Sequence, residues 1–168
     1  MIKKENNFAY IDGANLHKGI ADLGWKLDYK RFYVWLSEKY TVNKAYFFIG
    51  LIPKYKSLYT YLQECGFTIV FKETIYDDNG KTKGNCDAEV VLNVVRDYYE
   101  DKFDKVVLVT GDGDFACLAT FLLEKSKLRV IVGPDSKKCS YLLRRIQVPI
   151  VYLNGLQNKL GLKRKSPQ

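Results

Sequence analysis

Six short apolar runs, separated by stretches with helical spacing, constrain the fold of this chain more than any other feature. The clearest run, KVVLVT at residues 105–110, is typical of a strand that is covered on both faces. Between the runs, apolar residues recur every three or four positions, as they do in amphipathic helices. Strands that alternate with helices through short connections predict a parallel sheet with helices on both faces. The remaining runs span residues 8–11, 44–49, 68–71, 128–132 and 148–152.

We therefore expect a three-layer, Rossmann-like α/β fold with the strand order 3-2-1-4-5 and the sixth run as an edge strand. A chain of 168 residues fits one domain, and a domain of that size buries roughly 70% of the surface that its unfolded chain exposes. We expect this domain to cover residues 1–158. Residues 159–168, which end in the basic sequence KRKSPQ, are expected to form a disordered tail.

The charge balance favours a polyanionic partner such as nucleic acid, because 27 Lys and Arg stand against 19 Asp and Glu and give a formal net charge of +8. No apolar run approaches the roughly 20 residues of a membrane span, so we expect a cytoplasmic protein without a membrane partner. The four scattered cysteines suggest neither a zinc site nor a dense disulfide framework. The sequence leaves the oligomeric state open, a homodimer included.

Acidic residues follow the first and fourth predicted strands, despite the excess of basic residues in the chain. In such a sheet, ligands bind beyond the carboxyl ends of the strands, where strands one and four are neighbours. Asp12 ends the first strand, and Asp112 and Asp114 follow the fourth. Asp87 enters from the start of a long helix, on the same face as Val91, which packs on the sheet. The sequence therefore predicts four carboxylates in one crevice.

Such a cluster predicts a divalent metal site. Two carboxylates about 5 Å apart repel each other by roughly 3 kcal/mol at an effective dielectric of 20. Mg²⁺ or Mn²⁺ removes this repulsion, holds a phosphate and activates a water molecule. Each aspartate taken alone is also explained as a helix cap, and the convergence of all four favours the metal. Glu89 is a second choice as a ligand, because it lies about 200° round the helix from Asp87.

Three further residues are expected to bind the substrate. Asn15, one turn after Asp12, suits both a phosphate contact and a cap of the first helical turn. Ser136 is expected to head a helix whose free N–H groups receive a phosphate, although a plain cap has the same sequence. Lys83, one turn before Asp87, is expected to overhang the crevice and to neutralise phosphate. His17, the only histidine, argues against acid–base schemes that need several histidines, and we expect it at the surface.

Three segments resemble the motifs of the NYN domain family, relatives of the PIN-domain nucleases. They are YIDGAN at residues 10–15, KGNCD at residues 83–87 and VTGDGDF at residues 109–115. Their order and spacing agree with the family over nearly the whole chain. The resemblance implies a PIN-like fold and metal-dependent cleavage of RNA. It also implies supporting places for Asn15 and Ser136, and a metal role for Asp12, Asp87, Asp112 and Asp114.

Members of this family often carry another acid further along the long helix, where this chain has Asn93. This departure leaves open whether one or two metal ions bind. We interpret the chain as a Mg²⁺- or Mn²⁺-dependent ribonuclease that hydrolyses the phosphodiester bonds of single-stranded or structured RNA.

Two alternatives remain open. One is a non-catalytic RNA-binding module on the same fold, which keeps the crevice and the positive charge. The other is a metal-dependent phosphohydrolase of a small molecule, because a D-x-D sequence beyond a parallel strand also suits that chemistry. A phosphatase with a covalent aspartyl intermediate would need a general acid two residues after Asp12, where Ala14 stands. Neither the RNA target nor a preference for RNA over DNA follows from the sequence.

Overall fold

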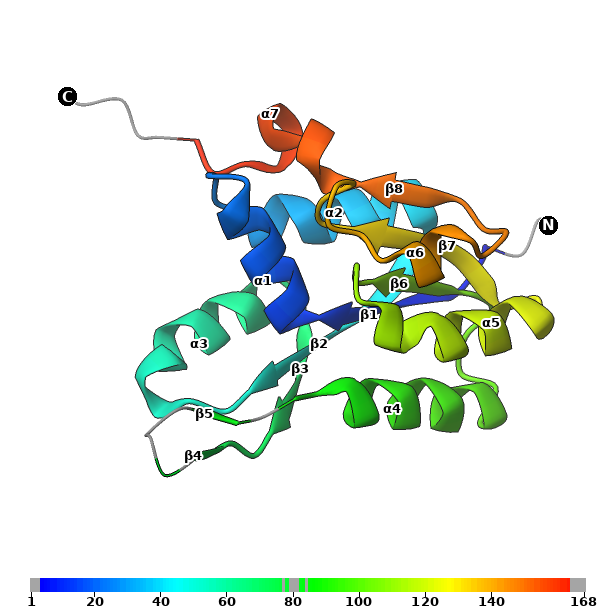
Figure 1. Ribbon diagram of the computed structural model, residues 1–168, viewed down its shortest axis with the longest axis horizontal. Coiled ribbons are helices and arrows are strands. Elements are labelled where there is room, and N and C mark those ends of the chain that lie inside the picture. The colour runs from blue at the N-terminus through cyan, green and yellow to red at the C-terminus, as the bar shows by residue number, and fades with distance from the viewer. Residues whose placement is uncertain (1–3, 77, 79–81, 84, 164–168) are drawn as a thin grey trace.

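The computed structural model describes residues 4–76, 78, 82–83 and 85–163. Its centre is a six-stranded parallel sheet with the order β3-β2-β1-β6-β7-β8 (Figure 1). Counted along the chain, the six strands of this sheet follow the order 3-2-1-4-5-6, which confirms the predicted fold. The strands are β1 (Asn7–Asp12), β2 (Val42–Gly50), β3 (Thr68–Lys72), β6 (Val106–Val109), β7 (Leu128–Gly133) and β8 (Ile150–Tyr152).

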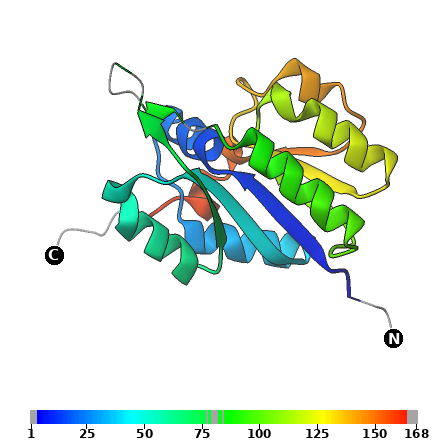
Figure 2. The same ribbon diagram turned by 90° about the horizontal axis from the view of Figure 1, so that it is seen from below.

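Helices cover both faces of the sheet, as Figures 1 and 2 show. One face packs against α1 (Gly13–Asp22), α2 (Tyr29–Tyr40), α3 (Lys56–Glu64) and α7 (Gln157–Leu160). The other face packs against α4 (Asp87–Tyr99), α5 (Ala116–Glu124) and α6 (Tyr141–Arg144). Short 3₁₀ turns lie at η1 (Pro53–Tyr55), η2 (Gly113–Phe115) and η3 (Leu153–Gly155).

The central strands are apolar throughout because both of their faces are buried. Along β1, Ala9 and Ile11 belong to the core beneath α1 and α2, whereas Phe8 and Tyr10 belong to the core beneath α4 and α5. This alternation of side chains directs successive residues of a strand to opposite layers. Because all six strands are parallel, the loops that follow β1 and β6 meet at one edge of the sheet.

A short antiparallel pair, β4 (Ile75–Tyr76) and β5 (Thr82–Lys83), lies between β3 and α4 (Figure 1). The sequence DDNG at residues 77–80 predicts a turn at this place. Residues 77 and 79–81 lie outside the described part of the chain. The two paired strands themselves are not evident from the sequence, because each is only two residues long.

The predicted start of a disordered tail at residue 159 is wrong, because the fold continues beyond it. Leu160 ends α7 and is 1% exposed, and Gly161 forms an isolated bridge with Leu27. The backbone N–H of Leu162 also donates to the carbonyl of Lys26. Residues 164–168 lie outside the described residues. Among the helices that the structure describes, none has the length and apolar character needed to cross a membrane.

Candidate metal centre

Asp12 lies at the end of β1, and its side chain connects the segment that follows β1 with the segment that follows β6. Its Oδ1 accepts a hydrogen bond from the Asn15 backbone N–H at 3.1 Å, so it caps α1. Its Oδ2 accepts from the Thr110 hydroxyl at 3.3 Å. The residue is only 8% exposed, and this burial raises the pKa of Asp12, with the charges of Asp87 and Asp112 adding to the effect. Asp12 therefore acts as a helix cap and is also part of the acidic cluster.

The loop after β6 places two further carboxylates beside it. Asp112 Oδ1 accepts from the Asp114 backbone N–H at 3.0 Å and caps η2. The Asp112 N–H in turn donates to Thr110 Oγ1 at 3.1 Å. The fully buried Thr110 hydroxyl thus links Asp12 to the Asp112 loop. The strand-end hydroxyl of Thr110, directly before GDGD, is evident from the sequence, but its link between Asp12 and the Asp112 loop is not.

Asp87 is the first residue of α4, and Asn85 fixes its position. Asn85 Oδ1 accepts from the Asp87 backbone N–H at 2.9 Å, and Asn85 Nδ2 donates to Asp87 Oδ2 at 2.8 Å. Partial burial raises the pKa of Asp87, and the charges of Asp112 and Asp114 raise it further. The start of α4 therefore directs a carboxylate toward the loop that follows β6.

One carboxylate oxygen from each of Asp87, Asp112 and Asp114 lies within 4.8 Å of the other two. Opposite ligands of a single Mg²⁺ lie about 4.2 Å apart, because each Mg–O distance is about 2.1 Å. The three side chains therefore fit one such ion after small adjustments. Their donor set is all oxygen, which suits a hard cation such as Mg²⁺ or Mn²⁺. Among the described residues, Asp12 is not in this group, and it is more buried than the three grouped aspartates.

The residues predicted to bind substrate have different surroundings. The amide oxygen of Asn15 accepts from the Gly111 backbone N–H at 2.8 Å, so Asn15 joins the loop after β1 to the loop after β6. Ser136 lies in a turn, and the prediction that it heads a helix is wrong, because α6 begins at Tyr141 with Ser140 as its cap. Lys83 belongs to β5, and its side chain is outside the described part of the structure.

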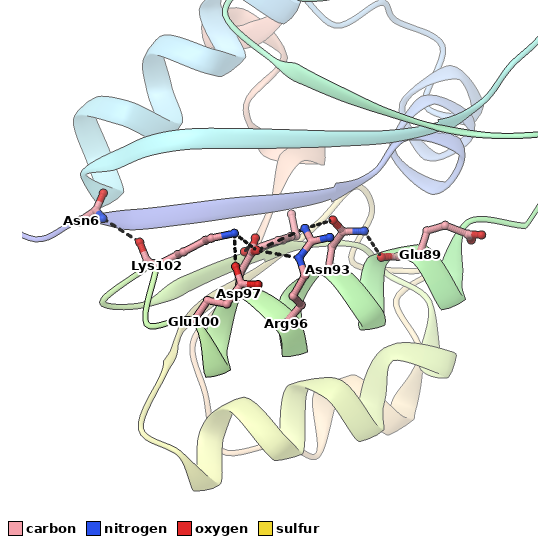
Figure 3. Close-up of polar contacts among 8 residues, drawn as sticks. Asn6, Glu89, Asn93, Arg96, Asp97, Glu100 and Lys102 are labelled. Atoms are coloured by element: carbon pink, nitrogen blue, oxygen red, sulfur yellow. Dashed lines mark hydrogen bonds and ion pairs between the residues drawn. The ribbon is translucent and has the colours of Figure 1, made fainter.

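Glu89 and Asn93 have partners away from the three clustered carboxylates. Glu89 forms an ion pair with Lys72 at the end of β3, and this pairing lowers the pKa of Glu89. Asn93 donates to the Glu89 carbonyl at 2.8 Å and accepts from Arg96 at 2.7 Å (Figure 3). Glu89 is therefore engaged by Lys72 and is not part of the group formed by Asp87, Asp112 and Asp114.

A buried polar contact fixes α4 on β1. The Tyr10 hydroxyl of β1 donates to Asp97 Oδ2 at 2.8 Å, and Asp97 is fully buried. Lys102 Nζ lies 3.2 Å and Arg96 Nε 3.4 Å from Asp97 Oδ1, so two cations offset the buried charge (Figure 3). Since β1 ends in Asp12 and α4 begins with Asp87, this contact helps to set the distance between two acids of the site.

Comparisons with known proteins agree with this architecture. The low amplitude and bright protein LabA of Synechococcus elongatus is 26% identical over 136 residues, which are 75% of this chain and 72% of LabA. A protein of unknown function from Vibrio parahaemolyticus, VPA0982, has the same fold, with a TM-score of 0.77 and 22% identity over 96% of this chain and 99% of that chain.

The T5 D15 flap endonuclease, solved with DNA and metal ions, has a TM-score of 0.49 and 14% identity over 80% of this chain and 57% of that chain. The model of the NYN domain matches residues 8–148, a range that contains the three sequence motifs and all four aspartates. The fold is a Rossmann-like α/β arrangement, and the chain belongs to the NYN domain family.

Proposed function

We propose that this protein is a metal-dependent ribonuclease that uses Mg²⁺ or Mn²⁺ to hydrolyse RNA phosphodiester bonds. The observation that carries the proposal is the group formed by Asp87, Asp112 and Asp114, whose oxygens lie within 4.8 Å of one another at the switch point of the sheet. Membership of the NYN domain family supports the same reading. The net charge of +8 supports a polyanionic substrate.

In this proposal the three clustered aspartates hold the metal ion, and Asp12 supports them from the buried side. A divalent ion at this place would supply a Lewis acid for the phosphate and a bound water of lowered pKa. The Thr110 hydroxyl bonds to both Asp12 and the Asp112 backbone, and so fixes the position of the Asp12 carboxylate relative to the loop that carries Asp112. Asn15 keeps the two loops together through Gly111. The protein therefore supplies a preorganised set of oxygen ligands that repel each other until a cation binds.

The test is cleavage of a labelled single-stranded RNA with Mn²⁺, Mg²⁺ or EDTA, by the wild type and by Asp112→Asn. We expect cleavage that needs the metal and disappears in the variant. Asp101→Asn is the matched control, because Asp101 is exposed beyond the far end of α4 and has a positive φ of 50° that asparagine tolerates. It should cleave like the wild type.

Other outcomes separate the alternatives. RNA that is bound but left intact under all metal conditions would favour the non-catalytic RNA-binding module. Hydrolysis of p-nitrophenyl phosphate without cleavage of RNA would favour the small-molecule phosphohydrolase. A single-stranded DNA of the same sequence in parallel reactions shows whether the 2′-hydroxyl matters to the enzyme.

A further inference from the structure

A cavity of about 620 Å³ lies beside α1, on the face of the sheet that α1, α2 and α3 cover. Binding pockets for small ligands commonly measure about 300–1,000 Å³, so this cavity has room for a flat heterocycle. The metal centre described above does not use it. Its lining residues come from α1, the loop that follows it, α2, α3 and the C-terminal segment, and they include His17, Trp25, Lys26, Tyr29, Leu58 and Tyr61.

The lining combines aromatic faces with a cation. Trp25 and Tyr29 are largely buried, whereas Tyr61, which also lines the cavity, is 36% exposed. Tyr29 packs edge-to-face against Tyr61 with ring centroids 6.3 Å apart, which holds the Tyr61 ring in place. Lys26 adds a positive charge, and within the described part of the chain no carboxylate lines the cavity. Aromatic faces beside a cation are the usual means of binding the bases of a single strand.

The cavity is also close to the metal centre along the chain. Asp12 caps α1, and His17, Ile20 and Ala21 on the same helix line the cavity. With a rise of about 1.5 Å per residue, His17 lies roughly 7 Å along the helix axis from Asp12. The near end of the cavity therefore lies between one and two helical turns from the end of α1 that Asp12 caps, within the length of a few nucleotides of an RNA strand.

We propose that this cavity binds one base of the RNA strand, a few nucleotides from the bond that is cut. The inference rests on the proposed function and makes it more specific, because it assigns the enzyme a single-stranded stretch of RNA next to the cleavage site. Tyr61 supplies the stacking face, and Lys26 neutralises a neighbouring phosphate. The absence of acids from the described lining and the net charge of +8 favour this polyanionic occupant over an apolar peptide.

His17 allows a direct test, because it is the only histidine of the chain and its imidazole protons give one set of NMR signals. A short single-stranded oligoribonucleotide is titrated into the wild type in EDTA, so that no RNA is cut. We expect saturable shifts of the His17 signals. Tyr61→Ala should weaken binding about tenfold, and Tyr61→Phe should keep it, because only the ring is needed. Tyr99→Ala, at an exposed position of α4, is the control and should bind like the wild type.

A second variant covers the case in which Tyr61→Ala does not fold. Ala21→Trp adds bulk at an exposed lining position of α1 and should remove the His17 shifts. Fluorescence anisotropy of a labelled oligonucleotide measures total binding in parallel. RNA binding without any shift of His17 would overturn the inference. So would His17 shifts that depend on protein concentration alone, because a second copy would then occupy the cavity.

The two proposals fail in different ways. If Mn²⁺ and Mg²⁺ give no cleavage but the His17 signals still shift with the oligonucleotide, the base-binding cavity stands and the nuclease proposal does not. If the RNA is cut but His17 and the Tyr61 variants show no response, the nuclease proposal stands and the cavity proposal is refuted.

Discussion

At the scale of single residues, Asp12 differs from the other three acids of the site in its surroundings. Asp114 is exposed and Asp87 and Asp112 are half-buried, whereas the Asp12 carboxyl is buried among hydrogen-bond donors. Burial favours the neutral form of a carboxyl, so the pKa of Asp12 is raised in the folded chain. In the absence of metal, the folded protein carries this charge at a cost that the unfolded chain does not have.

This cost leads to a prediction for Asp12→Asn that depends on pH. The pKa of Asp12 is higher in the folded chain than in the unfolded chain, so protonation of Asp12 stabilises the folded state. This stabilisation is complete below about pH 3.8 and is lost as the pH rises through the raised pKa. The metal-free variant should therefore melt at a higher temperature than the wild type at pH 7. The difference should shrink as the pH falls toward 4. Asparagine keeps the capping oxygen, so the start of α1 is retained.

The measurement is the melting temperature in EDTA at several pH values from about 4, close to the ordinary Asp pKa of about 3.9, to about 8. Asp101→Asn serves as the control and should follow the wild type at each pH. A difference between Asp12→Asn and the wild type that does not change with pH would show that the buried charge is not the cause. Cleavage by Asp12→Asn should be lost throughout.

At the scale of secondary-structure elements, the contact between Tyr10 and Asp97 determines how α4 lies on β1. Tyr10→Phe removes one hydrogen bond from a fully buried carboxylate. We expect the free energy of unfolding to fall by about 1–3 kcal/mol, the usual cost of a buried polar group that loses its partner. Urea unfolding measures this change. Tyr99→Phe, at an exposed position of the same helix, should have no effect, and equal losses in both variants would contradict the prediction.

The start of α1 depends on Gly13 for a different reason. A Cβ atom at this position would lie 2.5 Å from the Phe47 ring and 2.5 Å from the Phe48 carbonyl oxygen. Gly13→Ala therefore pushes α1 away from β2, although alanine is the better helix former by about 1 kcal/mol. We expect a loss of about 1–3 kcal/mol in the free energy of unfolding, with reduced cleavage because Asp12 moves with the helix.

The matched control is Gly155→Ala, because a Cβ atom there has no heavy atom within 4 Å among the contacts described. Its stability should be unchanged. Gly13→Ala with the stability and cleavage rate of the wild type would mean that α1 does not need this close approach.

At the scale of the whole molecule, the sequence was sufficient for the sheet order and for the convergence of Asp87, Asp112 and Asp114. Both follow from general properties of parallel sheets, because strand ends and helix starts share one edge. The roles of Thr110 and Asn15 were not predictable in the same way. Thr110 contacts Asp12 across 98 residues of sequence, and such a hydrogen bond depends on placement that periodicity does not specify. The prediction of a helix at Ser136 was wrong because a turn follows β7 and α6 begins only at Tyr141.

Metal binding should stabilise the whole chain, since the carboxylates repel each other without it. A ligand at a concentration 100 times its Kd adds about 2.7 kcal/mol to the free energy of unfolding. For a domain of this size, that corresponds to a rise of about 5–10 °C in Tm. We expect this rise with Mn²⁺ or Mg²⁺ in thermal melts of the wild type and a much smaller one in Asp112→Asn. Equal shifts in both proteins would place the metal elsewhere.

The pairing of β1 with β6 also has a consequence for synthesis on the ribosome. Asp12 and Asp112 are brought together by strands that are far apart in the chain. At about 5–20 residues per second, the ribosome adds the intervening residues in roughly 5–20 s. During this time β1 cannot pair with β6, because β6 has not yet been synthesised. The nascent chain thus has no assembled acidic cluster beside the messenger that encodes it, and the cluster forms only after most of the domain has been made.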